Sequence, residues 1–239
     1  MSNNFKLSKR LTRVAAYLPA GALFADIGSD HAYLPCYVCL LDNNAKAIAG
    51  EVNAGPYDSA RETVNHYKLT QRIDVRLGNG LEVVKQGEIK QLVIAGMGGS
   101  LIRSILEDGE DKFDCIERII TQPNVDAKNV RSWMMKNNYT ITSEEVIEEN
   151  GHFYEIIVGD VNTSGNISRL TDKKLFFGPL LLQNKTNAFY RKWEREQNKL
   201  QFVIEQLKQA KIPNDVKLEK FQTELEWIRE ELQDDKYNP

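Results

Sequence analysis

The chain has 239 residues, of which 41% are hydrophobic and 27% are charged, and its formal net charge is −3. These values are typical of a globular protein and leave room for one domain of normal size with a smaller one attached. The longest apolar runs fall short of the roughly 18 residues of a membrane span, residues 1–6 lack a secretory signal core, and three cysteines without regular spacing fit a reducing cytoplasm. We therefore expect a cytoplasmic protein that has no membrane partner.

The chain up to about residue 161 alternates between β-branched apolar runs and helical patterns. Strands are expected at residues 23–28, 46–52, 73–78, 91–96, 117–122, 139–148 and 152–161, and helices at 31–41, 56–67, 81–86, 99–107 and 126–137. This alternation predicts an α/β fold with a mostly parallel sheet and helices on both faces. Only Glu149-Asn150-Gly151 separates the last two strands, so the predicted seven-stranded, Rossmann-like sheet ends in an antiparallel hairpin.

Beyond residue 170 the pattern changes to two long amphipathic helices. Ile212-Pro213-Asn214 separates them, because proline lacks a donor and restricts the residue before it. We predict an antiparallel coiled-coil hairpin, with one domain over 1–165 and a second over 166–239. The expected apolar seam consists of Phe189, Trp193, Leu200, Val203, Leu207 and Ala210 in the first helix and Leu218, Phe221, Leu225, Ile228 and Leu232 in the second.

An acidic residue ends each of the first two predicted strands. Asp26 closes the first and precedes the turn Gly28-Ser29-Asp30, and Glu51 closes the second. This is the layout of a nucleotide-binding βαβ unit, in which the second acid accepts hydrogen bonds from a ribose diol. Asp30 stands where a phosphate-binding loop needs glycine, and a carboxylate there repels a pyrophosphate but attracts a cation. The pattern favours S-adenosylmethionine (SAM), which has a sulfonium and no phosphate, and hence a class I SAM-dependent methyltransferase.

The ends of the next three predicted strands carry glycines or amides. Asn79 can pair with the adenine edge of the cofactor, although Asn-Gly is also an ordinary turn sequence. Glycines in Gly96-Met97-Gly98-Gly99 permit close backbone approach to the methionine part, and Thr121-Gln122-Pro123-Asn124 places two amides beside it. The residues expected to bind SAM are Asp26, Gly28, Ser29, Asp30, His31, Glu51, Val52, Asn53, Asn79, Gly80, Gly96, Met97 and Gly98.

Two basic segments interrupt the mildly acidic chain. Residues 1–21 contain no acid, and residues 169–211 hold ten Lys or Arg against four Asp or Glu. Such segments fit a nucleic acid bound along one face, although basic helix faces are often only solvated surface. The residues expected to contact RNA are Lys6, Lys9, Arg10, Arg13, Lys185, Arg191, Lys192, Arg195 and Lys199.

Cys36 and Cys39 have the spacing of a redox motif or half a zinc site. They lie in an apolar helical pattern, and Cys115 is the remaining cysteine, so we expect both to pack in the core. His31 is expected to line the cofactor pocket. The sequence has no His, Cys and carboxylate set at metal spacing, so no metal is expected.

Five stretches match a known family: residues 7–11, 26–35, 50–53, 93–99 and 121–124. Among them, Asp30-His31-Ala32 and Gly96-Met97-Gly98-Gly99 are much more specific than a generic methyltransferase pattern. Through them the sequence resembles the bacterial tRNA (adenine-22 N1)-methyltransferases over essentially its whole length. The resemblance implies a tRNA substrate and methyl transfer to N1 of an adenine, at position 22. The C-terminal helical hairpin also fits this family, whereas Asn79 departs from the acid expected at its position.

Adenine N1 has an in-plane lone pair, so methyl transfer needs no strong base and depends mainly on exposing and aligning the base. The candidate catalytic residues are Asp30, Asn124 and Arg10. Asp30 could stabilise charge on the ring or bind the cofactor, Asn124 could accept from the exocyclic amine, and Arg10 could contact phosphate. Two alternatives remain open: methylation of a small molecule or protein, and a SAM-binding module that recruits partners without activity. We expect a monomer.

Overall fold

A computed structural model describes residues 7–165, 169–209 and 214–233. The chain forms two compact units, Met1–Leu170 and Thr171–Pro239. Residue 166, at which the second domain was predicted to begin, lies outside the described residues. Every helix in the described part of the chain is too short or too polar to span a lipid bilayer.

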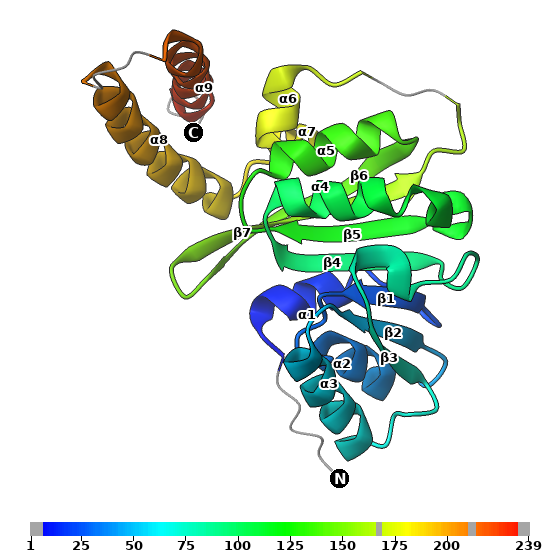
Figure 1. Cartoon of the computed structure of the whole chain (residues 1–239). Helices are drawn as coiled ribbons and strands as arrows, with labels where there is room; N and C mark the ends of the chain where they lie inside the picture. The colour runs from blue at the N-terminus through cyan, green and yellow to red at the C-terminus, as the bar shows by residue number, and fades with distance from the viewer. Residues whose placement is uncertain (1–6, 166–168, 210–213, 234–239) are drawn as a thin grey trace. The chain divides into compact units, whose positions relative to one another are not determined.

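The first unit is built on a seven-stranded sheet in the order β3-β2-β1-β4-β5-β7-β6 (Figure 1). Strands β1 to β5 are parallel to their neighbours, and β7 runs antiparallel to both β5 and β6. This confirms the predicted Rossmann-like sheet that ends in a hairpin. The strands are β1 (Leu23–Ile27), β2 (Lys46–Glu51), β3 (Ile73–Leu77), β4 (Gln91–Met97), β5 (Arg118–Pro123), β6 (Tyr139–Glu149) and β7 (His152–Val161).

Helices cover both faces of this sheet and bury its apolar side chains. On one face, Val14 and Leu34 pack in the same core cluster as Phe24 of β1. On the other face, Ile102 and Trp133 share a cluster with Ile94 of β4. The first face is covered by α1 (Lys9–Ala15), α2 (Tyr33–Leu41) and α3 (Ala54–His66), and the second by α4 (Gly99–Asp108) and α5 (Ala127–Lys136).

The connection between β3 and β4 differs from the prediction. A helix was expected at 81–86, but the chain forms only the short 3-10 helix η1 (Gly80–Val83). The backbone is already extended at Val84, with φ −107° and ψ 131°, so the chain leaves the helical conformation before residue 86. Within the described residues of this unit, two further elements were not predicted from the sequence, α1 and the 3-10 helix η2 (Glu110–Cys115).

The second unit contains the predicted helical hairpin, formed by α8 (Asn187–Lys208) and α9 (Asp215–Gln233), after the short helices α6 (Asp172–Phe177) and α7 (Pro179–Gln183). Its seam differs from the prediction by one position, because Ile204 is 6% exposed whereas Val203 is 36% exposed. Ala210 lies outside the described residues. Tightly packed rings stabilise the base of the hairpin: Phe176, Phe177, Phe189, Trp193 and Trp227.

Candidate active site

Two buried carboxyl groups stand at the carboxyl ends of neighbouring strands. Asp26, near the end of β1, is 4% exposed, and Glu51, the last residue of β2, is 6% exposed. The Ser29 hydroxyl donates to Asp26 Oδ2 at 2.6 Å, and the backbone N–H of Asp30 donates to Glu51 Oε1 at 2.5 Å. Ligands of open α/β sheets bind at this edge, so the two acids lie where the sequence predicted a cofactor.

Burial controls the protonation of both acids. Burial raises the pKa of Asp26 to about 7, and the negative charge of Glu51 also raises it. The hydrogen bond from Ser29 and the positive charge of Arg10 lower the pKa of Asp26. Burial likewise raises the pKa of Glu51, and the Asp30 N–H opposes this. A cation or hydroxyl donors bound here would favour the ionised forms. The pair therefore suits a ligand with a positive charge and a diol, as SAM has.

The turn after β1 has an unusual backbone. Asp30, His31 and Ala32 all have positive φ, at 44°, 67° and 55°, which costs free energy for residues with side chains. The Asp30 carboxylate is 82% exposed and lies 3.4 Å from His31 Nε2. In this structure Asp30 thus contributes its N–H to Glu51 and directs its side chain to solvent. Gly28 has φ +70°, a conformation that residues with side chains rarely adopt, so this position favours glycine.

Gln122 joins three segments at the site. Its side chain is fully buried, and its Oε1 accepts hydrogen bonds from Arg10 Nη1 and from the N–H of Gly96. Its Nε2 donates to Asn124 Oδ1 at 3.1 Å, and Asn124 Nδ2 donates to the carbonyl of Gly96 at 2.8 Å. Both backbone polar groups of Gly96 are therefore held by side chains from the end of β5.

The loops after β4 and β5 are also joined directly. The Asn124 N–H donates to the Met97 carbonyl, and the Gly99 N–H donates to the Val125 carbonyl, both at 2.8 Å. A Cβ on Gly99 would lie 2.1 Å from the Asp126 carbonyl oxygen, so no larger residue fits there. The segment Gly96–Gly99 is thus fixed by hydrogen bonds and close packing.

Arg10 enters the site from α1. Besides its bond to Gln122, its guanidinium lies 5.3 Å from the ring centroid of Tyr154, within cation–π range. A Cβ on Gly96 would lie 3.6 Å from Arg10 Nη1. Residues from the first and the last elements of this unit therefore meet beside the glycine segment.

The remaining predicted cofactor residues lie at the ends of β2 and β3. Val52 is 59% exposed, and Asn53 precedes α3. Asn79 is exposed, and its backbone N–H donates to Glu82 at 3.2 Å. Gly80 has φ +53°. No described contact ties Val52 or Asn53 to the buried acids; both follow Glu51 at the same edge.

Several residues predicted to contact RNA form contacts within their own unit. Arg13 pairs with Glu145 at 2.8 Å, and Lys9 Nζ donates to the Glu148 carbonyl at 3.2 Å. Lys6 lies outside the described residues.

The same holds in the helical unit. Lys185 pairs with Glu231 at 3.0 Å, Lys199 pairs with Glu196 at 2.6 Å, and the ammonium of Lys192 lies 4.2 Å from the Trp193 ring centroid. Arg191 and Arg195 are exposed on α8.

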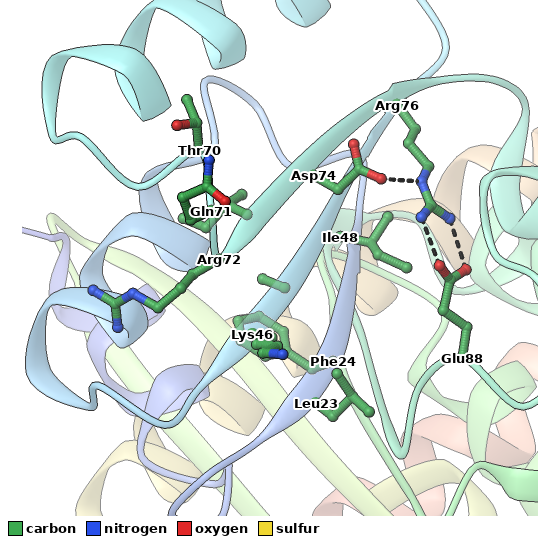
Figure 2. A pocket seen from close by; sticks show the side chains of 12 residues that line it. Leu23, Phe24, Lys46, Ile48, Thr70, Gln71, Arg72, Asp74, Arg76 and Glu88 are labelled. Atoms are coloured by element: carbon green, nitrogen blue, oxygen red, sulfur yellow. Dashed lines mark hydrogen bonds and ion pairs between the residues drawn. The ribbon is translucent and has the colours of Figure 1, made fainter.

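A pocket of about 250 Å³ lies away from these residues, beside the amino ends of β1, β2 and β3 (Figure 2). Leu23, Lys46 and Ile48 line it, and Arg76 points toward Asp74 and Glu88, with which it forms ion pairs at 2.8 and 2.6 Å. The Arg76 guanidinium lowers the pKa of Glu88 to about 2. None of the predicted cofactor residues lines this pocket.

The cysteines pack as predicted. Cys36 and Cys39 are buried, and burial raises their pKa to about 12 and about 11, so neither is a ready thiolate. Among the residues that the structure describes, no three His, Cys, Asp or Glu side chains gather as a metal site would require.

Comparisons with known proteins agree with this geometry. The family model of TrmK, described as tRNA (adenine(22)-N(1))-methyltransferase, matches residues 24–233. The tRNA (adenine(22)-N(1))-methyltransferase of Bacillus subtilis is 44% identical over 95% of this chain and 98% of its own length. A crystal structure of the B. subtilis M1A22 tRNA methyltransferase TrmK is similar to this chain, with a TM-score of 0.88 and 41% sequence identity. The match covers 96% of this chain and all of that one.

Two further solved structures contain the cofactor or its product. A Streptococcus pneumoniae protein in complex with S-adenosyl-L-methionine is 37% identical over 95% of this chain and 100% of that one, with a TM-score of 0.85. M. capricolum TrmK with S-adenosyl-homocysteine is 32% identical over 95% of this chain and 97% of that one, with a TM-score of 0.81. From the family match over most of its length and these identities, the chain belongs to the TrmK family of tRNA (adenine(22)-N(1))-methyltransferases.

Proposed function

We propose that the protein transfers a methyl group from SAM to N1 of adenine 22 in tRNA. The observation that carries this is the pair of buried acids, Asp26 and Glu51, beside the fixed glycine segment at the carboxyl edge of the sheet. It is supported by membership of a family with this activity and by relatives that bind SAM or its product. Because its proposed substrate is tRNA, we propose that the protein acts in the cytoplasm, as a monomer.

The residues present fit SAM by their chemistry. Glu51 ends β2, where an acid accepts from the ribose hydroxyls of a bound nucleoside. Asp26, whose pKa is raised by burial, offers a carboxylate that a cationic group would keep ionised. Gly28 follows β1 and Gly96 lies near the end of β4, at the same edge of the sheet as the two acids, so we assign them, with Met97 and Gly98, to the methionine part. SAM supplies an electrophilic methyl group on a positively charged sulfur.

The protein then has to expose and align adenine N1, because the N1 lone pair is nucleophilic once the base is unpaired and unstacked. We propose that the gain in rate comes mainly from this alignment. Arg10, fixed by Gln122 and Tyr154, is placed to contact a phosphate or the target nucleotide beside Gly96.

Asn124 and Asp30 receive different roles. Both polar groups of the Asn124 amide already bond to neighbours, so we propose that Asn124 chiefly shapes the glycine segment. An amide oxygen has two lone pairs, so we propose that Oδ1 also accepts from the exocyclic amine. The exposed Asp30 carboxylate can attract either the cofactor amino group or the charge that develops on the methylated ring.

We propose that the helical unit positions the tRNA. Exposed Arg191 and Arg195, one turn apart on α8, are expected to contact phosphates, together with Lys199. Lys185 and Lys192 lie against Glu231 and Trp193, so we give them a smaller share of the contact.

Methyl transfer from labelled SAM to unmodified tRNA, with protein and metabolite mixtures as parallel acceptors, tests the function. Label in tRNA alone is the expected result. Label in protein or metabolites and not in tRNA would support the first alternative. SAM binding without transfer to any acceptor would support the second, a recruitment module.

A further inference from the structure

The hairpin of β6 and β7 extends beyond the rest of the sheet (Figure 1). Its two strands pair from Tyr139 opposite Val161 to Glu149 opposite His152. By contrast, β5 pairs with β7 only as far as Thr121, opposite Ile157. Because β7 runs antiparallel to β5, its first residues project past the carboxyl edge, where the candidate active site lies.

The free end of this hairpin caps α1. The carboxylate of Glu149 accepts from the N–H of Lys9 at 2.6 Å with Oε1 and from the N–H of Arg10 at 3.3 Å with Oε2. The first N–H groups of a helix have no partner inside the helix, so a carboxylate from elsewhere can accept from them. Its negative charge also interacts favourably with the positive end of the helix dipole. Glu149 therefore binds the backbone of Arg10 itself.

The same hairpin also contacts the side chain of Arg10. The guanidinium lies 5.3 Å from the centroid of the Tyr154 ring on β7 and donates to Gln122. The hairpin thus holds Arg10 at its backbone and at its charged end. An ion pair between Arg13 and Glu145 also joins α1 to the hairpin, one turn further from the site.

We propose that Glu149 is a positioning residue for methyl transfer, which rests on the proposed function. It fixes the first turn of α1 and, together with Tyr154, holds Arg10 beside Gly96. Ser8 still caps α1 by accepting from the Leu11 N–H, so loss of the carboxylate charge loosens the start of the helix at Lys9 and Arg10 and lets the guanidinium leave its place. The effect on the reaction then runs through Arg10 alone.

A double-mutant cycle tests this dependence in the full-length protein. Glu149→Gln keeps the size of the side chain and removes its charge. We expect it to lower kcat on tRNA about tenfold and to leave the affinity for SAM at pH 8 within about twofold. The double variant Glu149→Gln/Arg10→Ala should have the same kcat as Arg10→Ala alone. Glu145→Gln is the matched control: it removes the ion pair between Arg13 of α1 and the hairpin, so we expect a lower Tm and an unchanged kcat.

A second readout needs no tRNA. The charged groups that act on Asp26 are Glu51 and Arg10, and the positive charge of Arg10 lowers the pKa of Asp26. We therefore expect Glu149→Gln and Arg10→Ala to move the pH midpoint of SAM binding upward by the same amount, and Glu145→Gln to leave it in place. Calorimetric titrations of SAM between pH 6 and 8.5 measure the midpoint.

Additive losses in the double variant, or an unmoved midpoint in Glu149→Gln, would overturn the proposal. If Glu149→Gln does not fold, the Tyr154 variants carry the test, with Tyr154→Phe expected to match wild type and Tyr154→Leu to reproduce Arg10→Ala. A wild-type protein that methylates no tRNA contradicts the proposed function instead, and the midpoint still tests Glu149.

Discussion

The buried amide of Gln122 accepts a hydrogen bond from the backbone N–H of Gly96 at 3.1 Å, which fixes the segment at the end of β4 from the neighbouring strand. The same oxygen accepts from Arg10. One side chain therefore sets the positions of the glycine segment that we assign to the cofactor and of the arginine that we assign to the tRNA.

Gln122→Leu removes this acceptor while keeping the volume. We expect a loss of about 1–3 kcal/mol in the free energy of unfolding, because Arg10 and Gly96 lose their partner, and a lower rate of methyl transfer. Denaturant unfolding and single-turnover kinetics measure the two effects. Asn129→Ala, which removes an exposed bond to Ser100 between α5 and α4, is the control and should change neither by much. A rate equal to wild type in Gln122→Leu would contradict this role.

Glu51→Ala tests the ribose assignment. We expect SAM binding to weaken by about 1.5–3 kcal/mol, roughly 10- to 150-fold, because hydrogen bonds to a charged acceptor are lost. Isothermal titration calorimetry measures the affinity. Glu117→Ala removes an exposed carboxylate that pairs with Lys90 at the opposite edge of the sheet and should bind SAM like wild type. Unchanged affinity in Glu51→Ala would refute the assignment.

The affinity for SAM should depend on pH through Asp26, whose pKa is raised to about 7. Below this pH the free protein holds Asp26 protonated, and binding of a cation must release the proton. We expect the dissociation constant to rise about tenfold per pH unit below 7. Asp26→Asn should bind more weakly at pH 8 and lose the pH dependence. Wild-type affinity that is constant between pH 6 and 8 would exclude Asp26 from the cofactor site.

The same group predicts how stability changes with pH. The folded pKa of Asp26, about 7, lies above the ordinary value of 3.8, so its contribution to stability is complete below the ordinary value and is lost as the pH rises through 7. Asp26→Asn should therefore gain Tm relative to wild type on going from pH 5 to pH 8. Thermal unfolding at the two pH values measures the difference, and a difference of opposite sign would contradict the raised pKa.

Replacing Arg191 and Arg195 together by alanine should weaken tRNA binding and lower the slope of log K against log salt by about 2, because each phosphate contact adds about one to it. SAM affinity should stay the same. Lys208→Ala, in the last turn of α8, is the control. Titrations over a range of salt concentrations decide the matter: an unchanged slope would remove α8 from the RNA contact.

The sheet could be predicted from sequence because its signals are local. β7 covers residues 152–161, as predicted, since β-branched residues alternate there between turn residues. The acids Asp26 and Glu51 could be predicted as neighbours because parallel strands end at one edge. Local signals misled at 81–86, where the backbone becomes extended at Val84. They also misled in α8, where adjacent Val203 and Ile204 are both strongly apolar and only packing distinguishes them.

The other features depend on contacts that are distant in sequence. α1 begins at the local N-cap Ser8, but its first turn also needs the carboxylate of Glu149, 140 residues away, which no window of sequence reveals. Arg10 was predicted as a surface cation for RNA, but its place against Tyr154 and Gln122 arises only when the hairpin folds back. Gln122 was noted as one of two amides at the end of a strand; its contact with Gly96 depends on the pairing of β4 with β5.

The most direct test of the account is the identity of the methylated atom. Unmodified tRNA transcript is incubated with the protein and SAM, digested, and analysed by mass spectrometry, with a transcript that carries guanine at position 22 as the control. We predict 1-methyladenine at position 22 and no methylation of the control. Methyl on the exocyclic amine, on a cytosine or on ribose, or methylation of the control at the same level, would contradict the account.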